Sequence, residues 1–180
     1  MTDTMDLVLE TDRLMLRHLD IGDAPFILSL LNEPAFLKFI GDRRVRNIDD
    51  AVAYILKGPT ASYRDHGFGL DLVQLKSNGT KIGICGLIQR EYLSAPDIGY
   101  AFLEQFWLKG YAVEVAAAVL QHARLVLGLP RIFAITSDEN IASIRVLEKI
   151  GLGFEKHFQQ PGYELPSRLY GIDLAETGRY

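Results

Sequence analysis

The sequence predicts an α+β protein with a mixed, mostly antiparallel central sheet of about seven strands flanked by helices. A clear β-hairpin lies mid-chain, with strands at 68–75 and 81–89 around the turn Ser77-Asn78-Gly79-Thr80. The C-terminal half alternates short strand patterns with helical ones. With 180 residues, 48% hydrophobic, and no repeat or low-complexity linker, residues 1–180 are expected to form one domain around one core.

The N-terminal region is predicted to begin with one strand over residues 7–17, with Leu14 and Leu16 on the same face. A helix follows over residues 20–32 and closes before Pro34. A second helical region covers residues 47–57. The pair Gly58-Pro59 must break or kink it, because proline lacks an N–H donor, and helical character resumes over 60–66.

The C-terminal half is predicted to contain a central strand at 97–103, an alanine-rich helix at 110–127 and a strand at 131–136. A helix at 139–150 and two last strands at 154–158 and 168–174 complete the order. Asp138 suits the N-cap of the 139–150 helix, and Gly151 stands just past its end.

Composition excludes several classes of protein. The formal net charge of -4 gives no basic field that would recruit nucleic acid. No apolar run approaches the ~20 residues that span a bilayer, and the acidic start lacks a signal-peptide pattern. The single cysteine, Cys85, lies in an apolar run and fits an inert buried thiol in a reducing compartment. We therefore expect a cytoplasmic protein that uses neither membrane nor nucleic acid.

Metal chemistry is not expected either. The four histidines, His18, His66, His122 and His157, are scattered without metal-ligand spacing, so structural or surface roles are predicted for them. The sequence holds no zinc motif, Walker loop or dinucleotide fingerprint.

The junction Trp107-Leu108-Lys109-Gly110-Tyr111-Ala112 leads from a strand into the alanine-rich helix. A helix start carries free N–H groups and the positive end of the helix dipole, so it attracts anions. Gly110 allows a positive φ, and Ala112 is small enough for a phosphate to approach. Many such junctions bind nothing, so a second motif is needed to support a site.

That second motif is the segment at 138–154. Together the two segments resemble the cofactor motifs of the GCN5-related N-acetyltransferases (GNAT), in the branch of ribosomal-protein N-terminal (RimJ/RimL-type) enzymes. The family patterns look like W-G-x-G-x-A-x-E-A and N-x-x-S-x-x-V-x-E-K-x-G-F. This chain matches them at Trp107, Gly110, Ala112, Glu114, Asn140, Ser143, Val146, Glu148, Lys149 and Gly151. The segments 10–17 and 97–100 also resemble that branch, so the likeness spans nearly the whole chain.

The resemblance implies a GNAT-type sheet that splays between its central strands. It implies transfer of an acetyl group from acetyl-CoA to a primary amine by direct attack in a ternary complex. The pantetheine arm would pair with the central strand, where an N–H near Phe102 polarises the acetyl carbonyl. The expected acetyl-CoA contacts are Ala101, Phe102, Leu103, Leu108, Lys109, Gly110, Tyr111, Ala112, Asn140 and Ser143.

Two catalytic residues are predicted from the same resemblance. Ser143 would lie near the sulfur and donate to the departing thiolate, although simple solvent exposure is the alternative. Asp97 is the first candidate for the general base, Glu91 the second, and a turn role after Pro96 is equally compatible with Asp97. Tyr100 is a candidate for positioning the substrate or for the core.

Three further residues have simpler alternative roles. Asn140 could only cap its helix, and Lys109 could simply be solvated. Glu114 is expected to stabilise the first turn of its helix rather than to take part in the chemistry.

The acceptor is left open between a protein N-terminal α-amine, such as that of a ribosomal protein, another peptide, and a small amine (a polyamine, an amino acid or an antibiotic). The regions at 36–46 and 159–167 are expected to face it, and Arg43, Arg44 and Arg46 either meet an acidic acceptor or are solvated. If the chain self-associates, a homodimer is the expected assembly.

One departure from the family pattern leaves a second function in view. Relatives usually have glycine where this chain has Leu108, and a positive φ there would cost about 1 kcal/mol or more. A non-catalytic acyl-CoA-binding or sensing module with the same fold is therefore the alternative. A nucleotide-binding protein of another fold would leave the 140–143 segment unexplained.

Overall fold

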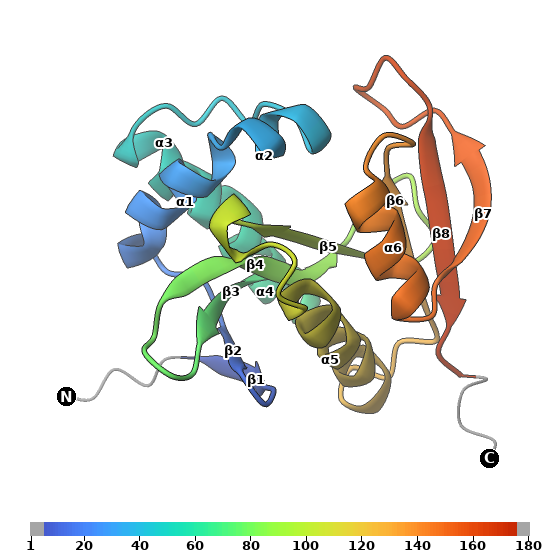
Figure 1. The fold of residues 1–180 in the computed structure, drawn as a ribbon, viewed down its shortest axis with the longest axis horizontal. Helices are drawn as coiled ribbons and strands as arrows, with labels where there is room; N and C mark the ends of the chain where they lie inside the picture. Colours follow the sequence, from blue (N-terminus) through green and yellow to red (C-terminus); the bar gives the residue numbers. More distant parts are fainter. Residues whose placement is uncertain (1–5, 176–180) are drawn as a thin grey trace.

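An eight-stranded mixed sheet runs through the centre of the molecule, in the order β1-β2-β3-β4-β5-β6-β8-β7 (Figure 1). The computed structural model describes residues 6–175. Its strands are β1 (Leu7–Glu10), β2 (Leu14–Arg17), β3 (Leu70–Leu75), β4 (Lys81–Ile88), β5 (Asp97–Phe102), β6 (Arg131–Thr136), β7 (Gly153–Phe158) and β8 (Ser167–Asp173). All paired strands are antiparallel except β5 and β6, which confirms the predicted α+β class.

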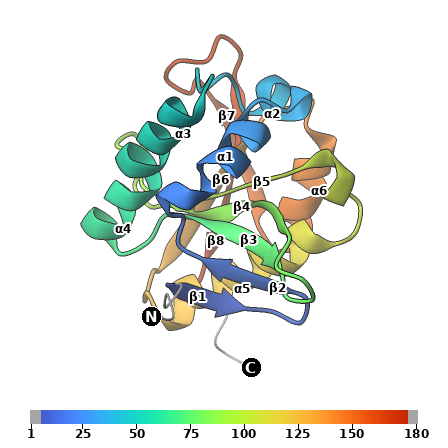
Figure 2. The ribbon, with the colours of Figure 1, turned by 90° about the vertical axis from the view of Figure 1, so that its left-hand side faces the viewer.

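Helices cover both faces of this sheet, as Figures 1 and 2 show. One face carries α1 (Ala24–Leu31), α2 (Pro34–Phe39), α3 (Ile48–Ile55) and α4 (Ala61–His66), and the other carries α5 (Tyr111–Leu125) and α6 (Ile141–Lys149). A separate hydrophobic cluster fills each side, because each strand sends alternate side chains to opposite faces. Leu14 and Leu16, predicted to share a face, are both fully buried in the α5 cluster.

The sheet opens between β5 and β6, as the family resemblance implied. Six residue pairs join β4 to β5, whereas the parallel β5–β6 pairing registers only Asp97 against Phe133. In Figure 1, β5 runs across the view while β7 and β8 stand upright, so the two halves of the sheet separate. The backbone of β5 beyond Asp97 thus has a strand on one side only.

Two predicted elements differ from the structure. The expected strand over 7–17 is a hairpin of β1 and β2, closed where Thr11 N–H donates to the Leu14 carbonyl at 2.9 Å, so the sheet has eight strands. At Gly58-Pro59 the α-helix is interrupted, as expected, but by a π-helical turn, Leu56–Thr60, that leads directly into α4 at 61–66. The wider turn accommodates a proline, whose missing N–H would interrupt an ordinary α-helix.

The predicted N-cap of α6 was wrong by two residues. The Asn140 side chain, not Asp138, caps this helix by accepting a hydrogen bond from the Ser143 N–H at 3.1 Å. Asp138 instead contacts His157 and Arg168 on β7 and β8. Gly151 ends the helix with a φ of 97°, as its position predicted.

Candidate active site

The start of α5 forms a cradle of free backbone donors. Within residues 6–175, no protein acceptor takes a hydrogen bond from the N–H groups of residues 108–113. Gly110, the N-cap, has a left-handed backbone with a φ of 80°, and Leu108 also has a positive φ, of 60°. The helix is 15 residues long, so its dipole adds to the field of these donors. The cradle therefore suits an anion such as a phosphate group.

A residue far away in the sequence holds the cradle in place. Arg13, in the β1–β2 turn, donates from Nη1 to the Lys109 carbonyl at 3.0 Å and from Nε to Glu114 at 2.7 Å. Its guanidinium also stacks 4.5 Å from the centre of the Tyr111 ring. Glu114 accepts a further hydrogen bond from Thr11 Oγ1 at 2.6 Å. Glu114 therefore ties the hairpin to the helix start, a structural role like the one expected for it.

Leu108 has the positive φ that was considered for this position, where relatives usually have glycine, and its side chain is fully exposed. We expect Leu108→Gly to raise the free energy of unfolding by about 0.5–1 kcal/mol, because relief of the positive φ outweighs the extra freedom of the unfolded chain. Urea unfolding measures the change. The matched control is Lys109→Gly, next to it and without a positive φ, which should lower stability. An unchanged or lower stability of Leu108→Gly would show that position 108 is unstrained.

The opening beside β5 exposes a row of backbone groups. Leu103 N–H donates to β4 and the Pro96 carbonyl accepts from β6, and backbone groups along a strand point alternately to its two sides. The groups on the β6 side are therefore those of Ile98, Tyr100 and Phe102, and beyond the Asp97–Phe133 pairing those of Tyr100 and Phe102 face the opening.

A single side chain already occupies part of this row. The Trp107 indole N–H donates to the Phe102 carbonyl at 2.9 Å, which fixes the end of β5 against the cradle and leaves the Phe102 N–H facing the opening.

A cavity of about 480 Å³ connects the cradle, β5 and α6. Eight of the predicted acetyl-CoA contacts line it: Ala101, Phe102, Leu108, Gly110, Tyr111, Ala112, Asn140 and Ser143. Leu103 does not, because its N–H bonds to β4 and its side chain packs on the α1–α3 side. Lys109 does not line it either; its ammonium group lies over the Phe106 ring, 5.3 Å from the ring centre.

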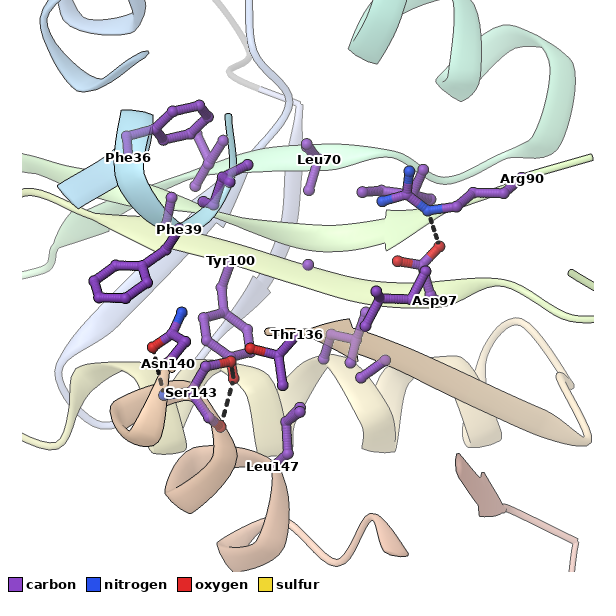
Figure 3. A pocket seen from close by; sticks show the side chains of 18 of the residues that line it. Phe36, Phe39, Leu70, Arg90, Asp97, Tyr100, Thr136, Asn140, Ser143 and Leu147 are labelled. Atoms are coloured by element: carbon purple, nitrogen blue, oxygen red, sulfur yellow. Dashed lines mark hydrogen bonds and ion pairs between the residues drawn. The ribbon is translucent and has the colours of Figure 1, made fainter. Parts of the chain in front are cut away.

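Ser143 and Tyr100 meet across the opening, as Figure 3 shows. The two hydroxyl oxygens lie 3.0 Å apart, and either can donate. Burial raises the pKa of the Tyr100 phenol, so this group keeps its proton at neutral pH. Ser143 is therefore oriented by a neutral hydroxyl partner rather than simply solvated.

A smaller cavity of about 150 Å³ extends from this point along β5 toward Asp97. Asp97 is buried at the point where β5 leaves β6, and Arg90 donates from Nε to its carboxylate at 2.7 Å (Figure 3). Burial raises the pKa of Asp97, while the Arg90 charge opposes that shift. Glu91, the second candidate base, is exposed and lines neither cavity.

Phe36 and Phe39 on α2 line the smaller cavity and fall within the region 36–46 that was expected to face the acceptor. The sequence signals did not indicate Tyr54 on α3, which also lines it, or Arg90, which holds Asp97 there. Helical periodicity indicates only that such residues face the interior, so it could not separate cavity from core. Within the described residues, no three His, Cys, Asp or Glu side chains gather as a metal site, and no helix is long and apolar enough to cross a membrane.

Comparison with known proteins places this geometry in a family. A family model described as "Acetyltransferase (GNAT) domain" matches residues 13–153. The uncharacterized N-acetyltransferase YoaA of Bacillus subtilis is 30% identical over 171 residues, covering 92% of this chain and 96% of that protein. A GNAT-family acetyltransferase structure from Bacillus anthracis superposes with a TM-score of 0.78 at 26% identity, covering 93% of this chain and 99% of that one.

A more distant structure shows the same fold. It is RimL, a ribosomal L7/L12 α-N-protein acetyltransferase in complex with coenzyme A, with a TM-score of 0.80 at 19% identity, covering 93% of this chain and 97% of that chain. The family match covers most of the chain and includes both the cradle and α6. This chain belongs to the GNAT family of acetyltransferases.

Proposed function

We propose that this acetyltransferase moves the acetyl group of acetyl-CoA to a primary amine by direct attack in a ternary complex, as in the RimJ/RimL branch. One observation carries the proposal. The anion cradle, the free edge of β5 and the Tyr100–Ser143 pair line one continuous cavity. Coenzyme A needs these features in that order, because it carries a pyrophosphate, an amide-bearing arm and a sulfur. The RimL structure, which contains coenzyme A, supports the assignment by likeness of fold.

The residues present fit this cosubstrate. The N–H groups of residues 108–113 would bind the pyrophosphate, and the Tyr100 and Phe102 backbone would pair with the arm. The side-chain nitrogen of Asn140 donates to no acceptor within residues 6–175, because its cap bond uses the oxygen, so it can donate to an amide carbonyl. When bound, acetyl-CoA supplies a thioester whose carbonyl carbon accepts an amine.

The chain contributes three chemical roles in this proposal. The Phe102 N–H polarises the acetyl carbonyl, as an oxyanion donor. Ser143 donates to the departing sulfur and receives in turn a hydrogen bond from Tyr100. Asp97 takes the proton of the amine, directly or through water, and its raised pKa makes it a better base than an exposed aspartate.

The test is transfer itself. We expect release of free thiol from acetyl-CoA that depends on an added amine, and a kcat about 100-fold lower in Ser143→Ala. The affinity for acetyl-CoA should change little, because the alanine variant keeps the helix and its cap. Ser77→Ala, in the exposed β3–β4 turn, is the matched control and should keep full activity.

Two results would contradict the proposal. Tight acetyl-CoA binding without turnover on a broad amine panel would support the binding-module alternative. An unchanged kcat in Ser143→Ala would remove Ser143 from the chemistry.

A further inference from the structure

The smaller cavity, called the acceptor cavity below, combines apolar walls with arginine side chains. Its apolar lining includes Phe36, Phe39, Ile40, Leu70 and Ile84. Its charged lining is Arg43, Arg90 and Asp97. Figure 3 shows the Arg90 guanidinium directed to the Asp97 carboxylate, so these two charges compensate each other. The cavity therefore retains the charge of Arg43.

The neighbouring carboxylate is not available to Arg43. Asp42 accepts the Arg44 N–H on Oδ1 at 2.7 Å and a guanidinium hydrogen bond from Arg46 on Oδ2. Within residues 6–175 no ion pair or hydrogen bond to Arg43 is formed. Of the three cations in this loop, Arg46 is thus paired on the surface and only Arg43 lines the cavity.

Arg43 and Tyr54 both line the acceptor cavity. The Arg43 charge acts on the Tyr54 phenol, whose pKa is raised by burial and lowered in part by that charge. The loop itself is held from the far side, because the Tyr163 hydroxyl donates to the Ile40 carbonyl at 2.9 Å. The β7–β8 connection therefore contacts the C-terminal end of α2, three residues before Arg43.

We infer that the acceptor amine carries a carboxylate and that Arg43 binds it. This inference rests on the proposed function and narrows its acceptor. An unpaired guanidinium beside an apolar wall recognises a planar anion through paired hydrogen bonds. The same charge disfavours a polyamine, which would bring a second cation into a cavity with no uncompensated carboxylate. The acceptor is thus a small amino acid or amino carboxylate with an apolar body.

The experiment compares each acceptor with its uncharged counterpart. Acetyl transfer is measured with L-phenylalanine, L-leucine and 4-aminobutanoate, each against its carboxamide, and with spermidine. We expect kcat/KM to favour at least one acid over its amide by about 10- to 100-fold. In Arg43→Gln this preference should fall below about threefold, mainly through a higher KM for the acid.

The matched control is Arg44→Gln. It removes the same charge at the next residue, whose side chain does not line the cavity. It should keep the preference, because only the local contact differs. Both arginines are exposed, so neither change should affect folding.

The outcomes separate the inference from the function on which it rests. Faster transfer to amides or spermidine than to any acid would overturn the carboxylate assignment and leave the acetyltransferase proposal intact. An undiminished preference in Arg43→Gln would remove Arg43 as the binding group. Failure with every amine of this panel would overturn the carboxylate assignment, whereas only failure on the broad amine panel would count against the proposed function.

Discussion

Replacing Gly110 with glutamate is expected to weaken acetyl-CoA binding about 100-fold. The new carboxylate would stand in the cradle of free N–H groups, where the proposal places the pyrophosphate. Like charges about 4 Å apart near a protein surface repel by roughly 1–4 kcal/mol, and each 1.4 kcal/mol is a tenfold change in affinity. Calorimetric titration with acetyl-CoA measures the loss.

Gly110→Gln is the control for this variant. Glutamine has nearly the same size and carries the same cost of a side chain at a φ of 80°, but no charge. A Cβ at this position would lie 3.4 Å from Arg13 Nη2, so either side chain fits with a small adjustment. The glutamine variant should bind only a fewfold more weakly than the wild type.

Salt provides a second check on the same pair of variants. The difference in affinity between Gly110→Glu and Gly110→Gln should shrink as ionic strength rises, because exposed charges are screened. Equal affinities in folded proteins, verified by circular dichroism, would show that the pyrophosphate lies elsewhere.

The sequence predicted the order of elements because local signals marked most of them. The Asn78-Gly79 turn and the alternating runs beside it indicated β3 and β4 directly. The β1–β2 turn gave no such signal, since Thr11-Asp12-Arg13 lacks glycine and proline, and one strand was predicted where there are two. The helical path through Pro59 likewise depends on a π-helical turn for which the sequence carries no local signal.

The candidate site was predictable where a motif fixed it and not where tertiary contacts did. Gly110, Asn140 and Ser143 line the larger cavity, as the two motifs indicated. Leu103 was expected to contact the cosubstrate as part of the central strand 99–103, but strand alternation turns its backbone toward β4.

Long-range partners were outside the reach of the sequence. The contact of Arg13 with Glu114 joins residues 101 positions apart, and that of Arg90 with Asp97 forms across a loop without a motif. No periodicity or spacing encodes such pairs. These contacts nevertheless hold the cradle in place and influence the pKa of Asp97.

A second large effect concerns stability, at a buried ion pair far from the cavities. Asp23→Ala is expected to lower the free energy of unfolding by about 3–5 kcal/mol. Arg17 and Asp23 are both buried and share two hydrogen bonds of 2.8 Å, and Lys81 adds another at 2.6 Å. Removing the carboxylate leaves the Arg17 guanidinium buried without its partner. Urea unfolding measures the loss.

The double variant Arg17→Met with Asp23→Leu tests whether the loss comes from the missing ion pair itself or from leaving one charge buried without a partner. It should recover most of the lost stability, because apolar side chains of similar volume need no partner. A double variant as unstable as Asp23→Ala would mean that the strands need this ion pair to assemble. Gln74 would then be expected to contribute to the same stabilisation, since its side-chain oxygen accepts a hydrogen bond from Arg17 Nε at 3.1 Å.

The same ion pair should make the stability of the wild-type protein depend on pH in the acid range. Burial alone would raise the pKa of Asp23, but hydrogen bonds from Arg17 and Lys81 bring it from 3.8 down to about 2. A group with a lowered folded pKa stabilises fully above its unfolded pKa and loses that contribution as pH falls through the folded value. The contribution of about 2 kcal/mol should therefore be lost between about pH 5 and pH 2. Asp23→Asn, measured over the same range, should show a correspondingly shallower acid dependence, and an unchanged slope would place the acid-sensitive group elsewhere.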